Sequence, residues 1–134
     1  MKSKQILSVE QMKHLQELGL DTSDGSMCWC YALSYKNAKW ELEIYEDVIN
    51  QKRDSAFWEI IPTYTLQDIL DKLPTLIIIS SDFYKICIEP SCGYWDIYYY
   101  KSDATELISK KSENIIDAAY DMSVSYTHLR AHET

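Results

Sequence analysis

Two predicted β-hairpins constrain the fold of this chain more than any other feature of its sequence. In the first, residues 27–34 are aromatic and apolar, and residues 40–48 alternate between apolar and polar side chains, as a half-buried strand does. A two-residue turn at Lys36-Asn37 would place the large apolar side chains of both strands on one face, which is how register is normally fixed. The predicted pairs are Leu33 with Trp40, Tyr31 with Leu42 and Trp29 with Ile44.

The second predicted hairpin pairs residues 83–89 with residues 94–101. A four-residue loop, Pro90-Ser91-Cys92-Gly93, joins them and again gives one continuous apolar face. Residues 76–79, Leu-Ile-Ile-Ile, are predicted to form a short buried strand. The predicted pairs of the hairpin are Ile88 with Trp95, Ile86 with Ile97 and Tyr84 with Tyr99.

Capping residues followed by apolar residues at helical spacing predict helices. Ser8 and Gln11 have the form of a capping box, and Gly19 is placed to end that helix in a left-handed conformation. Thr65 with Asp68 at the N3 position begins a second helix in the same way.

A third helix is predicted to begin at Ser112, and it completes an α+β fold. We expect an antiparallel sheet of about five strands in two hairpin units, with about three helices packed on one face, in the order αββαβββα. At 134 residues the chain has room for one domain. Residues 1–123 are expected to form that domain, with a last helix that is cut short.

The last eleven residues, 124–134, resemble the translation of a transposase-type sequencing adapter, and every residue of Val-Ser-Tyr-Thr-His-Leu-Arg-Ala-His-Glu-Thr matches. This resemblance implies a non-native tail. His128 and His132, which are spaced like a metal pair on a helix, are therefore discounted. The alternative is a natural tail.

Three other stretches, residues 7–23, 61–74 and 113–120, are similar to a group of small proteins of gut bacteria of the Bacteroides kind and of their phages or mobile elements. The resemblance covers most of residues 7–122. Because the matching residues are capping and packing positions, it implies no activity and no ligand.

The net charge of −8 and a pI near 4.8 exclude several classes of function. With only two arginines, Arg53 and Arg130, and scattered lysines, direct binding of nucleic acid or of anionic membranes is not expected. The longest strongly apolar run, residues 76–79, is far short of the roughly 20 residues of a membrane span. No signal-peptide pattern is present, so a cytoplasmic location with reduced cysteines is expected.

The cysteines are the residues to test as a metal site. In the predicted registers Cys28, Cys30 and Cys87 lie on polar faces and Cys92 lies in a turn. A Cys-x-Cys pair on a strand spreads its sulfurs about 6–7 Å apart, whereas structural zinc is usually held by tighter Cys-x2–4-Cys pairs. We therefore predict no metal and no cofactor.

No residues stand in a catalytic pattern. His14 has no evident partner in the sequence, and carboxylates such as Glu41 and Glu43 are typical of the solvated side of a strand. The chain is accordingly predicted not to be an enzyme.

Tyr94, Tyr98 and Tyr100 are predicted to share the sheet face that points away from Trp95 and Ile97. Exposed aromatic residues are typical of protein interfaces, although tyrosine is also simply common in strands. The prediction is a non-enzymatic, cytoplasmic interaction module of a phage or mobile element, whose partner is a protein, either another protein or a second copy of this chain. The alternative is an acidic inhibitor that mimics nucleic acid and blocks a host nucleic-acid enzyme.

Overall fold

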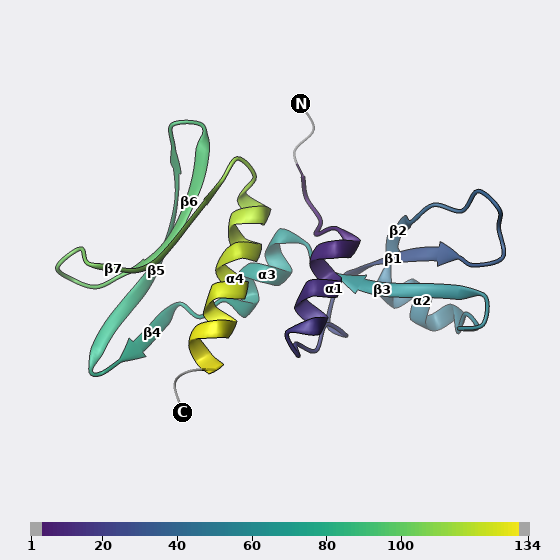
Figure 1. The fold of residues 1–134 in the computed structure, drawn as a ribbon, viewed down its shortest axis with the longest axis horizontal. Coiled ribbons are helices and arrows are strands. Elements are labelled where there is room, and N and C mark those ends of the chain that lie inside the picture. Colours follow the sequence, from purple (N-terminus) through teal and green to yellow (C-terminus); the bar gives the residue numbers. More distant parts are fainter. Residues whose placement is uncertain (1–3, 132–134) are drawn as a thin grey trace. The chain divides into compact units, whose positions relative to one another are not determined.

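The computed structural model describes residues 4–131 and has an α+β fold with antiparallel sheets, as predicted. Contacts divide the chain into an N-terminal unit, residues 6–68, and a C-terminal unit, residues 69–134 with residues 1–5 (Figure 1). The described residues form seven strands in two sheets and four helices, so the expected single sheet of about five strands with three helices is corrected. The elements are α1 (Val9–Glu17), β1 (Met27–Ala32), β2 (Glu41–Ile44), α2 (Tyr45–Gln51), β3 (Trp58–Thr63), α3 (Leu66–Lys72), β4 (Leu76–Ile79), β5 (Asp82–Ser91), β6 (Tyr94–Tyr100), β7 (Glu106–Ser112) and α4 (Ile115–Ala131).

The N-terminal unit contains a three-stranded sheet in the order β2-β1-β3. Trp29 pairs with Leu42 rather than with Ile44, so the predicted register of the first hairpin is wrong by two residues. The connection explains the shift. The Ala38 N–H donates to the Tyr35 carbonyl and closes the predicted turn around Lys36-Asn37, but a second turn, closed by the bond from the Tyr35 N–H to the Ala32 carbonyl, precedes it. The Leu33 N–H donates to the carbonyl of Phe57, next to β3, so β1 and β2 do not stay paired up to the turn. A shift of two residues leaves every side chain on its predicted side of the strand.

The prediction that Cys28 and Cys30 lie on a polar face is wrong. Both are buried in a cluster with Val48, because the chain turns into helix α2 at Tyr45 instead of continuing as a strand. Tyr45 and Val48 are three residues apart, so one face of α2 presents both to the sheet. Lys52 ends the helix in a left-handed conformation with φ 51°.

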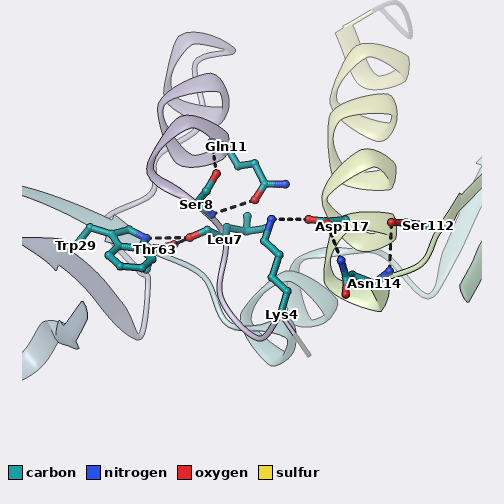
Figure 2. Close-up of polar contacts among 9 residues, drawn as sticks. All are labelled: Lys4, Leu7, Ser8, Gln11, Trp29, Thr63, Ser112, Asn114 and Asp117. Atoms are coloured by element: carbon teal, nitrogen blue, oxygen red, sulfur yellow. Dashed lines mark hydrogen bonds and ion pairs between the residues drawn. The ribbon is translucent and has the colours of Figure 1, made fainter. Parts of the chain in front are cut away.

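Both predicted capping boxes are confirmed. Ser8 accepts a hydrogen bond from the Gln11 backbone and donates its own backbone N–H to the Gln11 side chain (Figure 2). Thr65 and Asp68 exchange the same two bonds at the start of α3. Gly19, at φ +89°, closes α1 as predicted.

In the N-terminal unit, helices lie on both faces of the sheet. The carbonyl of Leu7, next to the start of α1, accepts hydrogen bonds from the side chains of Trp29 and Thr63, each at 2.9 Å (Figure 2). Those side chains lie on the opposite face of the sheet from Cys28 and Cys30, which α2 covers. The expectation of helices on one face is therefore corrected for this unit.

The C-terminal unit contains a four-stranded sheet in the order β4-β5-β6-β7. The hairpin of β5 and β6 turns through Cys92 and Gly93 alone, at φ 50° and 86°. Two successive residues with positive φ are typical of a tight two-residue hairpin turn. Ile88 therefore pairs with Ile97, and the predicted four-residue loop and its register are wrong by two residues.

Helix α4 lies along one side of this sheet, in contact with β6 and β7 (Figure 1). It begins at Ile115, so the predicted cap at Ser112 is wrong; the Ser112 hydroxyl instead accepts a hydrogen bond from the backbone of Asn114. Lys4 and Asp117 form an ion pair of 2.8 Å at its first turn (Figure 2). The fully buried residues of the helix are Ile116, Ala118, Ala119 and Met122.

Residues 124–131 prolong α4, but none of residues 124–130 is buried. The buried side of the helix thus ends at Met122, and the next residue, Ser123, has a buried hydroxyl with no hydrogen-bond partner among the described residues. The adapter origin of the tail stays a prediction, and His132 lies outside the described residues.

We expect Ser123→Ala to stabilise the protein by about 1 kcal/mol. The change removes an unsatisfied buried hydroxyl and introduces the best helix former. Thermal unfolding would then shift upward by about 3 °C. Ser125→Ala, in the same helix, is the control that measures helix propensity alone; a fall in the melting temperature of Ser123→Ala would contradict the prediction.

Candidate functional site

The four-stranded sheet has one face under α4 and one face that no helix in the described part of the C-terminal unit covers. Ile97 and Tyr99 point toward α4 and are fully buried, and the Tyr99 hydroxyl donates to the carbonyl of Pro74 at 2.6 Å. Because side chains alternate along a strand, Tyr94, Tyr98 and Tyr100 point to the opposite face. The register of β5 and β6 places Tyr98 opposite Cys87 and Tyr100 opposite Lys85.

The three tyrosines differ in exposure. Tyr94 is exposed, while Tyr98 and Tyr100 are half-buried with their ring centroids 5.6 Å apart. The Tyr98 hydroxyl donates to the Glu89 carboxylate at 3.1 Å. The pKa of the Tyr98 hydroxyl is raised above its ordinary value, first by the contact with Cys87 and then by burial and by Glu89. The hydroxyl therefore keeps its proton and remains a hydrogen-bond donor. The hydrogen bond to Glu89 therefore orients the Tyr98 ring, which lies against Tyr100.

The same face extends onto β4 and β5, which the sequence analysis did not include in the candidate surface. Ile78 and Phe83 pair across these strands, and each is 57% exposed. Leu76 is also exposed and lies opposite Lys85. Alternate residues of a strand share a face, and Phe83 lies four residues before Cys87 in β5. The sequence pattern was therefore sufficient to place Phe83 on this face. We call the surface formed by Leu76, Ile78, Phe83, Tyr94, Tyr98 and Tyr100 the tyrosine face.

A hollow of about 550 Å³ lies at the β5 end of the tyrosine face. Phe83 and Tyr100 supply its apolar lining, and Lys85 and Lys101 supply its positive charge. Lys101 also lies 3.7 Å from the Asp82 carboxylate. Asp82 also lines the hollow, and the Asp103 carboxylate lies 3.8 Å from Lys101, so the positive charge of Lys101 is compensated by two carboxylates.

The cysteines are arranged differently from the prediction. The sulfurs of Cys28 and Cys30 are 3.6 Å apart instead of about 6–7 Å, because the two side chains lean toward each other. Cys87 is half-buried on the tyrosine face, and Cys92 is exposed in the turn. Among residues 4–131, no group of three or more His, Cys, Asp or Glu side chains is placed to hold one metal ion.

An ion pair lies beside the two buried sulfurs. Arg53 donates two hydrogen bonds of 2.7 Å to the Glu43 carboxylate, and its guanidinium stacks over the Trp58 ring at 4.5 Å. The hydrogen bonds from Arg53 lower the pKa of Glu43. Burial raises the pKa of both thiols, so they are protonated at neutral pH. This cluster was not predicted from the sequence, because Glu43 and Arg53 are ten residues apart and are brought together by α2.

Two histidines considered in the sequence analysis lie on helices. His14 lies on α1, and His128 is exposed near the end of α4. No helix in the described part of the chain is long and apolar enough to cross a membrane. Comparisons with protein-family models, with curated proteins and with solved structures find no match for this chain.

Proposed function

We propose that this chain is a non-enzymatic, cytoplasmic interaction module of a phage or mobile element, and that it binds a protein partner through the tyrosine face. The observation that carries this proposal is the exposure of large apolar side chains on one uncovered sheet face. Ile78 and Phe83, each 57% exposed, continue the surface begun by Tyr94, Tyr98 and Tyr100. Several exposed apolar side chains on one sheet face are typical of interaction sites.

The chemistry of the face favours protein as the partner. Tyrosine contributes a large contact area and loses little conformational freedom on binding, and aromatic residues are enriched in interface cores. The hydrogen bond to Glu89 already orients Tyr98, which reduces the entropy lost on binding. Lys85 in the adjoining hollow favours a partner segment with an apolar side chain next to a carboxylate. A second copy of the acidic chain offers such carboxylates too.

The test is capture of partners from the host by the tagged full chain, followed by affinity measurement with the captured protein and by sedimentation of the chain alone. We expect Tyr98→Ala to weaken binding by about 1–2 kcal/mol, or roughly 5–30-fold, as at an interface hot spot. Tyr35→Ala is the matched control, because Tyr35 is 71% exposed and lies in the N-terminal unit. Equal binding by wild type and Tyr98→Ala would contradict the proposal.

The distribution of charge favours the alternative, a nucleic-acid mimic, as the second candidate. Residues 6–68 contain eleven acidic and five basic residues and so carry most of the net charge of −8. A complex formed by charge mimicry loses affinity steeply as salt rises, whereas one formed by an aromatic face changes little. Binding at 50 mM and 500 mM salt distinguishes the two candidates. Strong salt dependence with an unaffected Tyr98→Ala variant would favour the mimic.

A further inference from the structure

Two buried thiols in direct contact are the feature of this molecule that the proposed function leaves unused. Cys28 and Cys30 are alternate residues of β1, the central strand of its sheet, and their sulfurs are 3.6 Å apart. Metal–thiolate bonds are about 2.3 Å long, so one ion can bridge two sulfurs that are up to about 4.6 Å apart. Because a two-coordinate ion holds its sulfurs nearly in line, the Cys28 and Cys30 side chains need to rotate apart by about 1 Å from the observed separation.

A disulfide fits the same pair less well. Its sulfurs must approach to about 2.05 Å, and its Cα atoms are at most about 6.8 Å apart. Alternate residues of a strand are separated by about 6.6 Å, which is close to that limit. Strand β1 is hydrogen-bonded to β2 on one side and to β3 on the other, and both ladders hold Cys28 and Cys30 in place. The sheet thus resists the contraction that a disulfide needs.

We propose that Cys28 and Cys30 form a two-sulfur site for a thiophilic monovalent metal ion, of the chemistry of copper(I). Thiolate sulfur is the ligand that soft ions such as copper(I) select. Only two protein sulfurs meet in this cluster, and among the described residues no further cysteine, histidine or carboxylate completes a larger ligand set. Two-coordinate binding is open to a soft monovalent ion, whereas structural zinc requires four ligands.

Charged side chains next to the pair compensate part of the charge of the bound form. On binding, each thiol releases its proton to solvent and each thiolate donates one electron pair to the ion, which gives a complex with one net negative charge and no change of oxidation state. Arg53 interacts electrostatically with both sulfurs and supplies the opposite charge. Glu43, bound to Arg53 at 2.7 Å, holds the guanidinium in position; its carboxylate also accepts a hydrogen bond from the Cys30 thiol, and its negative charge opposes the compensation.

The surroundings supply shielding and a path of entry. Val48, with Tyr45, Trp58 and Ile60, forms an apolar shell around the sulfurs that excludes water. Cys30 also lines a hollow of about 530 Å³, together with Trp58 and the loop residues 35–39. An ion can therefore reach Cys30 from this hollow and then be shared with Cys28.

The test is anaerobic titration of the reduced full chain with copper(I) in competition with a chromogenic copper(I) chelator. We expect one ion per chain, and we expect Cys28→Ser and Cys30→Ser each to lower the affinity by about 100-fold or more, because each removes half of the ligands. The double variant Cys87→Ser/Cys92→Ser is the matched control, and it should bind like the wild type. Zinc offered under the same conditions should not bind.

X-ray absorption of the copper-loaded wild type keeps the test independent of whether the serine variants fold. Two sulfur neighbours with no nitrogen or oxygen support the proposal. Copper held by Cys87 or Cys92, additional light-atom ligands, or complete loss of the ion to the chelator would overturn it. None of these outcomes bears on the tyrosine face, so the two proposals stand or fall separately.

Discussion

Ile97→Ala is expected to lower the free energy of unfolding by about 2–5 kcal/mol, the largest effect of any change considered for this protein. Ile97 is 0% exposed and lies between Ile88 of β5 and Lys110 of β7, on the face that α4 covers. Removing its side chain loses the transfer free energy of the buried carbons and leaves a cavity that a sheet paired on both sides cannot close. Urea denaturation monitored by tryptophan fluorescence measures the change.

Tyr98→Ala, at the next position of the same strand, is the control. Its side chain points to the uncovered face, so we expect a loss close to the 0.5 kcal/mol that is usual for surface substitutions. A variant that binds poorly but unfolds like the wild type would separate binding from stability. If Tyr98→Ala unfolds the protein while Ile97→Ala has no effect, the two faces of the sheet are inverted and the tyrosine face cannot be a partner surface.

Local signals in the sequence identified the helix starts with the most success. The capping boxes of Ser8 and Thr65 depend on residues only three positions apart, so nothing distant in the chain alters them. The hairpin registers depend on the connecting loops, and both were wrong by two residues. Neither the bond from Leu33 to Phe57 nor the positive φ of Cys92 is evident from the residue types alone.

Elements with few apolar residues were missed for a different reason. Strand β7 contains Leu107 and Ile108 among polar and charged residues, because it is an edge strand, and lysines are usual there. Helix α2 was predicted to be the end of a strand. The spacing of Leu42, Ile44 and Val48 fits one long strand with alternating side chains, and it fits equally well a short strand followed by a helix. Periodicity over so short a segment does not distinguish the two.

The same contrast between local signals and the effects of distant residues explains which candidate site could be predicted. The tyrosines could be assigned to one face because an even shift of register preserves the alternation of side chains. The Cys28–Cys30 pair could not be placed, since its burial depends on α2 and its short sulfur separation depends on side-chain rotamers. Two errors in the sequence interpretation, the polar face and the wide spacing, therefore concealed the cluster that supports the metal proposal.

Gly25→Ala is expected to destabilise the N-terminal unit by about 1–3 kcal/mol, as overpacking of a buried site does. Gly25 is buried in the loop before β1, and a Cβ built on it would lie 2.6 Å from the Thr63 carbonyl oxygen and 3.0 Å from the Thr63 nitrogen. Both are backbone atoms of β3, which is paired with β1 at Met27, so they cannot rotate away as a side chain would.

Gly19→Asn is the control for Gly25→Ala, because a Cβ at Gly19 meets nothing within 4 Å and asparagine tolerates its positive φ of +89°. We expect the control to cost less than about 1 kcal/mol, whereas Gly25→Ala should lower the denaturation midpoint clearly. Fluorescence of Trp29, whose indole is bound to Leu7 in the same unit, follows the change. Equal stability of the two variants would mean that the loop moves away from Thr63. The close approach of residue 25 to β3 would then not be needed to hold β1 and β3 together.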